Sequence, residues 1–192
     1  MNYVLVVTGT CGSGKTTIAS LIGQRDGWAH SSEDKLWLAM FGRDCGAFGS
    51  DEHIRKREAV HAAVFRFVLT ALADRRSVVI DATVHEAPPS AFYEYRDFFE
   101  ANHIAWVLRV LHPALAVAIE RDARRCGWHA GPERVAKLRA KFNASTFDES
   151  TFTDTSSESA EVTLQRVLAA APNPSQPTCH GLRPSHAGEL KL

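Results

Sequence analysis

The sequence of 192 residues lacks the features that mark secreted and membrane proteins. Its four cysteines are scattered without the spacing of a disulfide framework, which favours reduced thiols and a cytoplasmic location. No apolar stretch reaches the length needed to cross a bilayer. The N-terminal segment MNYVLVVTG has no basic start of the kind that opens a signal peptide. We therefore expect a cytoplasmic protein with no membrane partner.

The chain also has no excess of one charge and no internal repeat. Its 22 Lys and Arg residues balance 22 Asp and Glu residues, so no overall field attracts nucleic acid, although a local basic groove is not excluded. Hydrophobic residues make up 45% of the sequence, enough for one core. The last residues are poor in apolar side chains and hold four of the eight prolines. We expect one domain over residues 1–171 and a disordered tail over 172–192.

Short apolar runs alternate with helical patterns along most of the chain. The apolar runs predict strands over residues 3–8, 28–31, 77–80, 104–111 and 151–155. Apolar spacing predicts helices over residues 16–22, 36–41, 53–73, 90–102, 113–126, 132–142 and 158–170. This alternation predicts an α/β fold, a three-layer α/β/α sandwich with a parallel five-stranded sheet and right-handed crossovers.

The strongest motif is GTCGSGKT at residues 9–16, directly after the first predicted strand. It fits G-x-x-x-x-G-K-[ST] at every fixed position. In this motif the glycines let backbone N–H groups converge on phosphate oxygens, the lysine reaches the β- and γ-phosphates, and the last hydroxyl binds Mg²⁺. No N/T-K-x-D motif follows, which favours ATP over GTP. The residues expected to bind the nucleotide are Gly12, Ser13, Gly14, Lys15, Thr16 and Thr17, with Thr16 on the metal.

Four stretches of the sequence resemble small P-loop kinases of the polynucleotide-kinase, zeta-toxin and chloramphenicol-phosphotransferase type, the AAA_33 group. Gluconate and shikimate kinases are more distant relatives. The stretches are the glycine loop, HSSEDKLWLAMFG, SVVIDAT and ERDARRCGWHAGPERVAKL, with FTDTSSESAEVTLQRVL as a weaker fifth. The resemblance implies a P-loop NTPase fold of the nucleoside-monophosphate-kinase type, ATP and Mg²⁺ as cofactors, and a helical lid at about residues 121–135.

The segment HSSEDKL carries the first candidate catalytic acid. The family pattern places an acid just after the second strand, facing the acceptor hydroxyl, and Asp34 matches it. The resemblance implies that this carboxylate orients the hydroxyl and takes its proton, with Glu33 as the runner-up. The alternative is a capping box, in which Ser31 and Asp34 start the next helix. Trp37 would line an acceptor pocket, or else be an ordinary core or surface aromatic.

Asp81 ends the predicted strand SVVID, at the edge where open α/β sheets bind their ligands. It would hold a Mg²⁺-bound water or contact the acceptor; a turn acid is the alternative. Arg121 and Arg125 lie on one face of a predicted helix. The resemblance implies that both close over the phosphates, whereas the alternative is a solvated face that pairs with Glu120 and Asp122.

These features favour an ATP- and Mg²⁺-dependent phosphotransferase acting on a hydroxyl of a small polar acceptor. A sugar, a nucleoside or an antibiotic would fit, the last making the chain a resistance kinase. One alternative is a polynucleotide 5′-hydroxyl kinase with a basic groove built from Arg55, Lys56 and Arg57. The other, of a different class, is a non-catalytic switch that binds ATP and phosphorylates nothing.

Overall fold

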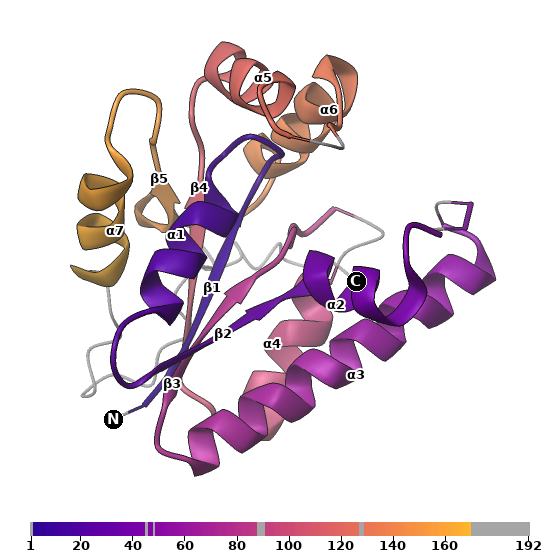
Figure 1. Ribbon diagram of the computed structural model, residues 1–192, viewed down its shortest axis with the longest axis vertical. Helices are drawn as coiled ribbons and strands as arrows, with labels where there is room; N and C mark the ends of the chain where they lie inside the picture. Colours follow the sequence, from indigo (N-terminus) through magenta and orange to yellow (C-terminus); the bar gives the residue numbers. More distant parts are fainter. Residues whose placement is uncertain (1, 45, 48, 88–90, 127–128, 170–192) are drawn as a thin grey trace, which may run out of the picture.

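The computed structural model describes residues 2–44, 46–47, 49–87, 91–126 and 129–169. Five parallel strands form one sheet in the order β2-β3-β1-β4-β5. They are β1 (Val4–Gly9), β2 (Trp28–Ser32), β3 (Ser77–Asp81), β4 (Trp106–Leu111) and β5 (Phe152–Thr153). Helices cover both faces of the sheet (Figure 1), so the predicted three-layer α/β/α sandwich is confirmed. The tail predicted for 172–192 lies outside the described residues.

The helices follow the predicted order, with shifted ends. They are α1 (Lys15–Gly23), α2 (Glu33–Phe41), α3 (Asp51–Ala73), α4 (Phe92–Ala101), α5 (Leu115–Ala123), α6 (Pro132–Asn143) and α7 (Ala160–Ala169). Helix α3 starts two residues before its predicted start because the Ser50 hydroxyl accepts a hydrogen bond from the His53 N–H at 3.2 Å. Strand β5 is shorter than predicted because residues Glu149–Thr151 form a 3₁₀ turn.

Strand β1 is apolar at successive residues because both of its faces are buried against helices. Val4 and Val6 belong to a core cluster with α3 and α4, whereas Leu5 and Val7 belong to a second cluster with α1 and α7. In Figure 1, α1 and α7 lie on one side of the sheet, and α3 and α4 lie on the other. Burying one such Val or Leu side chain stabilises the fold by roughly 1.5–3 kcal/mol. The sheet is therefore fixed from both sides.

Because the strands are parallel, their carboxyl ends meet at one edge of the sheet. The glycine loop follows β1 there, and α2 follows β2 directly. Helices α5 and α6 rise above this edge (Figure 1). Ligands of open α/β sheets bind at such an edge, so the fold itself brings the candidate site residues together. None of the helices among the described residues is long and apolar enough to cross a membrane.

Candidate active site

The glycine loop joins β1 to α1 and leaves the first N–H groups of the helix without a side-chain cap. Gly14 precedes α1 in the left-handed region, with φ of 93°, and has no side chain that could cap the helix. Helix α1 then begins at Lys15, which is 6% exposed. Uncapped N–H groups at a helix start attract anions, and this end of the helix dipole is positive. The loop therefore has the geometry of a phosphate site.

Gly12 lies directly against α5. Its φ is 76°, and a Cβ atom built there would lie 2.0 Å from the carbonyl oxygen of Ala118. The neighbouring Cys11 is buried against Ala118 and Val135. Only glycine fits at this approach, so the loop is held against α5 and α6 by main-chain and small side-chain packing.

Asp81 lies beside the loop, at the carboxyl end of β3. Its carboxylate is 3% exposed, and its Oδ2 accepts a hydrogen bond from the Ser32 hydroxyl at 3.3 Å. Burial raises the pKa of Asp81; the charge of Lys15 and the hydroxyl of Thr16 act in the opposite direction, and the charge of Asp34 adds to the rise. Its Oδ1 is buried and has no hydrogen-bond partner at normal distance among the described residues. This buried oxygen, near Thr16, suits a metal-bound water.

Asp34 is the second residue of α2, and its side chain is exposed. Its charge reaches Asp81, so the structure brings the two candidate acids together at the same edge. The capping box considered for Ser31 and Asp34 is not formed: α2 begins at Glu33, after Ser32, without a side-chain cap from any described residue. A capping box over Ser31 and Asp34 needs Ser31 directly before the helix, whereas Ser32 holds that position and its hydroxyl donates to Asp81 instead.

Trp37 packs between α2 and α3. Its ring centroid lies 5.7 Å from that of Phe41 and 5.2 Å from that of His53. The side chain is half-buried against the core cluster on the α3 face of the sheet. Its predicted place in an acceptor pocket stays a prediction.

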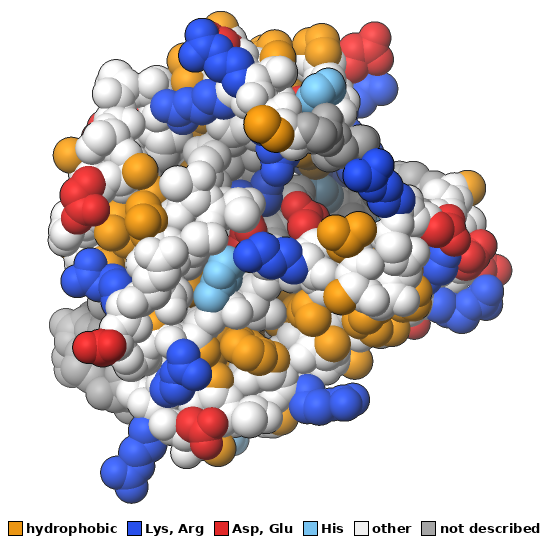
Figure 2. Space-filling view, in the orientation of Figure 1, with side chains coloured by type: hydrophobic (Ala, Val, Ile, Leu, Met, Phe, Trp, Pro, Cys, Tyr) orange, Lys and Arg blue, Asp and Glu red, His pale blue; other side chains and the backbone are white. Residues whose placement is uncertain are grey.

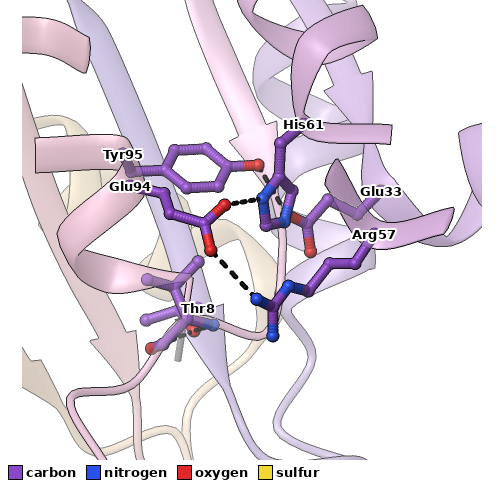
Figure 3. Close-up of polar contacts among 7 residues, drawn as sticks. Thr8, Glu33, Arg57, His61, Glu94 and Tyr95 are labelled. Carbon is purple, nitrogen blue, oxygen red and sulfur yellow. Dashed lines mark hydrogen bonds and ion pairs between the residues drawn. The ribbon is translucent and has the colours of Figure 1, made fainter. Parts of the chain in front are cut away.

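A partly buried polar cluster joins α2, α3 and α4, and no local pattern in the sequence predicts it. His61 lies between two carboxylates, with Nδ1 2.5 Å from Glu94 Oε2 and Nε2 3.2 Å from Glu33 Oε1 (Figure 3). The Tyr95 hydroxyl donates to Glu33 Oε1 at 2.5 Å, and Arg57 pairs with Glu94 at 3.0 Å. Glu33, the runner-up for the catalytic base, is therefore engaged by two partners. We call these five residues the Glu33–His61–Glu94 cluster.

Thr8, in the same view, fixes the loop that follows Asp81. Its hydroxyl accepts from the Val84 N–H at 2.8 Å and donates to the Val84 carbonyl oxygen at 3.0 Å. Thr8 is fully buried. The contact ties the chain after β3 to the end of β1, which helps to hold Asp81 beside the glycine loop.

Arg121 lies on the other side of the loop. Its guanidinium donates to the carbonyl oxygens of Thr155 at 2.8 Å and Ser156 at 3.3 Å. It lines a cavity of about 180 Å³ whose other walls include Gly14, Thr17 and Glu158. This cavity lies next to the phosphate loop and has both apolar and polar walls.

Arg125 lies beyond the end of α5, which stops at Ala123, so the prediction that it shares a helix face with Arg121 is wrong. It lies 3.6 Å from Asp122, and its side chain is 37% exposed. Asp122 is 1% exposed, and its Oδ2 accepts from the N–H groups of Ala130 and Gly131 at 2.8 and 3.0 Å. Asp122 therefore anchors the start of α6 to α5, a role that sequence reasoning missed. The predicted lid over 121–135 includes residues 127–128, which lie outside the described residues.

The surface around this edge carries both charge signs. Figure 2 shows it hollowed between the α5–α6 part and the α2–α3 part, with acidic and basic side chains around the hollow. The basic groove considered for residues 55–57 is largely neutralised: Lys56 pairs with Asp44 and Glu52, and Arg57 pairs with Glu94.

A phosphate loop after the central strand, with a buried acid at the end of the next strand, defines a P-loop nucleotide-binding protein. The chain belongs to the AAA domain family, whose model matches residues 4–145. The predicted membership of this group of small P-loop kinases is thus confirmed. No curated protein sequence matches the chain.

Solved structures of P-loop kinases share the fold. A sugar kinase from Janibacter sp. HTCC2649 is 20% identical, with a TM-score of 0.61, over 88% of this chain and 94% of that one. The tunicamycin resistance protein of Deinococcus radiodurans is 15% identical, with a TM-score of 0.65, over 88% and 95%. A chain of the Pnkp1/Rnl/Hen1 RNA repair complex is 23% identical, with a TM-score of 0.59, over 74% of this chain. Only 44% of that longer chain is matched.

Proposed function

We propose that the protein is an ATP- and Mg²⁺-dependent phosphotransferase that moves the γ-phosphoryl group of ATP to a hydroxyl of a small polar acceptor. The observation that carries this proposal is the meeting of Lys15, Thr16, Asp81 and Asp34 at one edge of the sheet. A phosphate loop alone would suit a switch as well as an enzyme. An exposed carboxylate next to it suits an acceptor that must lose a proton.

The donor would lie on residues 12–17. The loop N–H groups and Lys15 hold the phosphates, and the cavity lined by Arg121 receives the base. Thr16 and Asp81 would hold Mg²⁺ directly or through water, since Mg²⁺ keeps most of its waters and needs few protein ligands. The buried Oδ1 of Asp81, which has no hydrogen-bond partner at normal distance in the described part of the chain, fits this. When bound, the ion neutralises phosphate charge in the transition state.

In the transfer, the acceptor oxygen bonds to the γ-phosphorus while the bond from that phosphorus to the β–γ bridging oxygen breaks. ADP leaves with the bridging oxygen, and the acceptor proton passes to Asp34. Arg125 is the remaining candidate for stabilising the transferring group, once it exchanges Asp122 for the phosphate.

A small acceptor is favoured over a polynucleotide. Two of the three candidate groove cations are paired with carboxylates, and the whole chain has a formal net charge of +0. Proteins of the same fold include a sugar kinase, a gluconokinase and a tunicamycin resistance protein, all named for small molecules. A sugar, nucleoside or antibiotic hydroxyl is therefore the acceptor to test first.

The test is a transfer screen with γ-labelled ATP against gluconate and other sugars, nucleosides, aminoglycosides, chloramphenicol, tunicamycin and 5′-hydroxyl oligonucleotides. We expect one small-molecule class to be labelled, and Asp34→Asn to lower kcat by about 10²–10⁴-fold with ATP affinity unchanged. Asp26→Asn, which changes another exposed aspartate, is the matched control. Label on the oligonucleotides alone, or full activity of Asp34→Asn, would refute the proposal.

A further inference from the structure

Three consecutive residues, Ser32, Glu33 and Asp34, connect β2 to α2, and the first two are fixed by side-chain contacts. Ser32 donates to Asp81 Oδ2 at 3.3 Å. Glu33 accepts from Tyr95 and lies 3.2 Å from His61 Nε2. Asp34 is exposed and makes no hydrogen bond or ion pair with the described residues. The chain thus restrains both preceding residues and leaves the carboxylate of the third available.

The restraint on Glu33 comes from a residue that is itself held on two sides. His61 is 3% exposed, and its two ring nitrogens face Glu33 on α2 and Glu94 on α4. Figure 3 shows the ring between these carboxylates, with the Tyr95 ring beside it. Phe65 packs against it from its own helix. The imidazole is therefore a bridge that connects three helices.

Charge balance favours the doubly protonated ring. The ionisable groups that face His61 are Glu33 from α2, and Glu94 and Tyr95 from α4; Arg57, on α3, reaches the cluster through Glu94. Two carboxylates then meet one guanidinium and one imidazolium. Burial lowers the pKa of His61, but hydrogen bonds and charge from Glu33 and Glu94 outweigh it, so the pKa is raised above 6.5.

We propose that His61, by bridging Glu33 and Glu94, is the positioning residue that fixes the first turn of α2 and so presents Asp34 to the acceptor hydroxyl. The inference rests on the proposed function, in which Asp34 is the base. A charged imidazole has two N–H donors and satisfies both carboxylates, whereas a neutral one has a single N–H and leaves one carboxylate facing a lone pair. Loss of the proton therefore removes one of the two bonds by which His61 connects α2 to α4, and leaves Glu33 with Tyr95 alone or Glu94 with Arg57 alone.

The pH dependence follows from the sign of the shift. Because the folded-state pKa of His61 is raised, its contribution is complete below about pH 6.5 and is lost as the pH rises through the folded-state value. We expect kcat to fall on the alkaline side while KM for ATP stays constant.

The activity test uses MgATP and the acceptor that the screen identifies. His61→Gln should lower kcat near pH 6.5 by about 10–100-fold, the usual effect of a displaced catalytic group, and should abolish the alkaline fall. Glu94→Gln should keep the fall but move it to lower pH, since one carboxylate that raises the pKa is gone. His103→Asn, which removes an exposed histidine, is the matched control and should change neither. An alkaline fall unchanged in both cluster variants would overturn the inference.

A second measurement separates this inference from the proposed function. Amide hydrogen exchange of residues 34–41, compared with that of α1 at each pH, needs no acceptor. In the wild-type chain the protection of α2 relative to α1 should drop as the pH rises through the raised pKa of His61, and in Glu94→Gln it should drop at lower pH. Constant relative protection would overturn the positioning role of His61, even if transfer activity is found. A drop in protection without any transfer would support the positioning role and count against the proposed kinase activity.

Discussion

The surroundings of Asp81 suit its carboxylate better when a cation is bound than when the protein is free of ligand. It is almost fully buried, accepts one bond from Ser32, and keeps its second oxygen without a normal hydrogen-bond partner among the described residues. Burial raises the pKa of Asp81, so the ionised carboxylate is less favourable in the folded chain than in the unfolded chain. Functional sites often contain residues that reduce the stability of the free protein, here a buried carboxylate whose charge a bound cation would compensate.

Replacing this carboxylate should therefore separate stability from function. For an acid with a raised pKa, the stability is greatest below the unfolded-state value near 3.8 and is reduced as the pH rises through the folded-state value. Asp81→Asn should raise the Tm of the nucleotide-free protein at pH 7 but not at pH 3.5. It should also weaken Mg²⁺ affinity in the ATP complex by about 10–100-fold. Differential scanning fluorimetry and calorimetry measure the two effects; a lower Tm at pH 7 would contradict the assignment.

Gly12 allows a prediction with a well-matched control. Gly12→Ala places a methyl group 2.0 Å from the Ala118 carbonyl oxygen, whereas Gly27→Ala has the same positive φ and no atom within 4 Å. The left-handed backbone costs both variants about 1–2 kcal/mol. Only Gly12→Ala should also lose nucleotide affinity, because the loop must move away from α5. Chemical denaturation and ATP titration of the two variants check this, and equal ATP affinity would contradict it.

The residues of the site differ in how visible they are in the sequence. Gly12–Thr17 could be predicted because their function depends on neighbours in the chain. Asp34 and Asp81 could be predicted because each directly follows or ends an apolar strand. His61 and Asp122 could not, because their partners lie on other elements or after a turn, and no local spacing records a contact between α2, α3 and α4.

At the scale of elements, the buried carboxylate of Asp122 connects the end of α5 to the start of α6. Asp122→Ala would leave the N–H groups of Ala130 and Gly131 without their acceptor. Since each is a bond to a charged group, we expect a loss of about 3 kcal/mol and faster amide exchange in α6. The control variant Glu120→Gln alters only an exposed ion pair with Arg124, and it should change neither the stability nor the amide exchange of α6. Unchanged exchange in Asp122→Ala would show that packing alone holds α6.

The element boundaries show where sequence patterns stop being informative. The start of α2 is earlier than its first apolar residue, since Glu33 and Asp34 face partners or solvent and not the core. Strand β5 is limited to two residues by the 3₁₀ turn, which Asp148 caps by accepting from the Ser150 N–H at 2.8 Å. Capping and ion pairing decide both boundaries, and neither affects the spacing of hydrophobic residues.

At the scale of the whole molecule, nucleotide binding should stabilise the fold globally. Ligand at 100 times its Kd adds about 2.7 kcal/mol, which for a chain of this size corresponds to a rise in Tm of about 5–10 °C. Thermal unfolding with MgATP measures this. Lys15→Met should abolish the rise, because its ammonium lies beside the phosphate loop and Asp81. An equal rise in that variant would place the nucleotide elsewhere.

The strand order β2-β3-β1-β4-β5 places different candidate site residues on the two sides of the central strand β1. On one side of β1, strands β2 and β3 lead to Asp34 and Asp81; on the other, β4 and β5 lead to Arg121 and Thr155. Under the proposed function, the acceptor would lie on the β2 side and the nucleotide base on the β4–β5 side, with the glycine loop and Asp81 holding the phosphates and Mg²⁺ between them. Substitutions on the acceptor side could then change which compound is phosphorylated, while the residues that hold ATP stay the same.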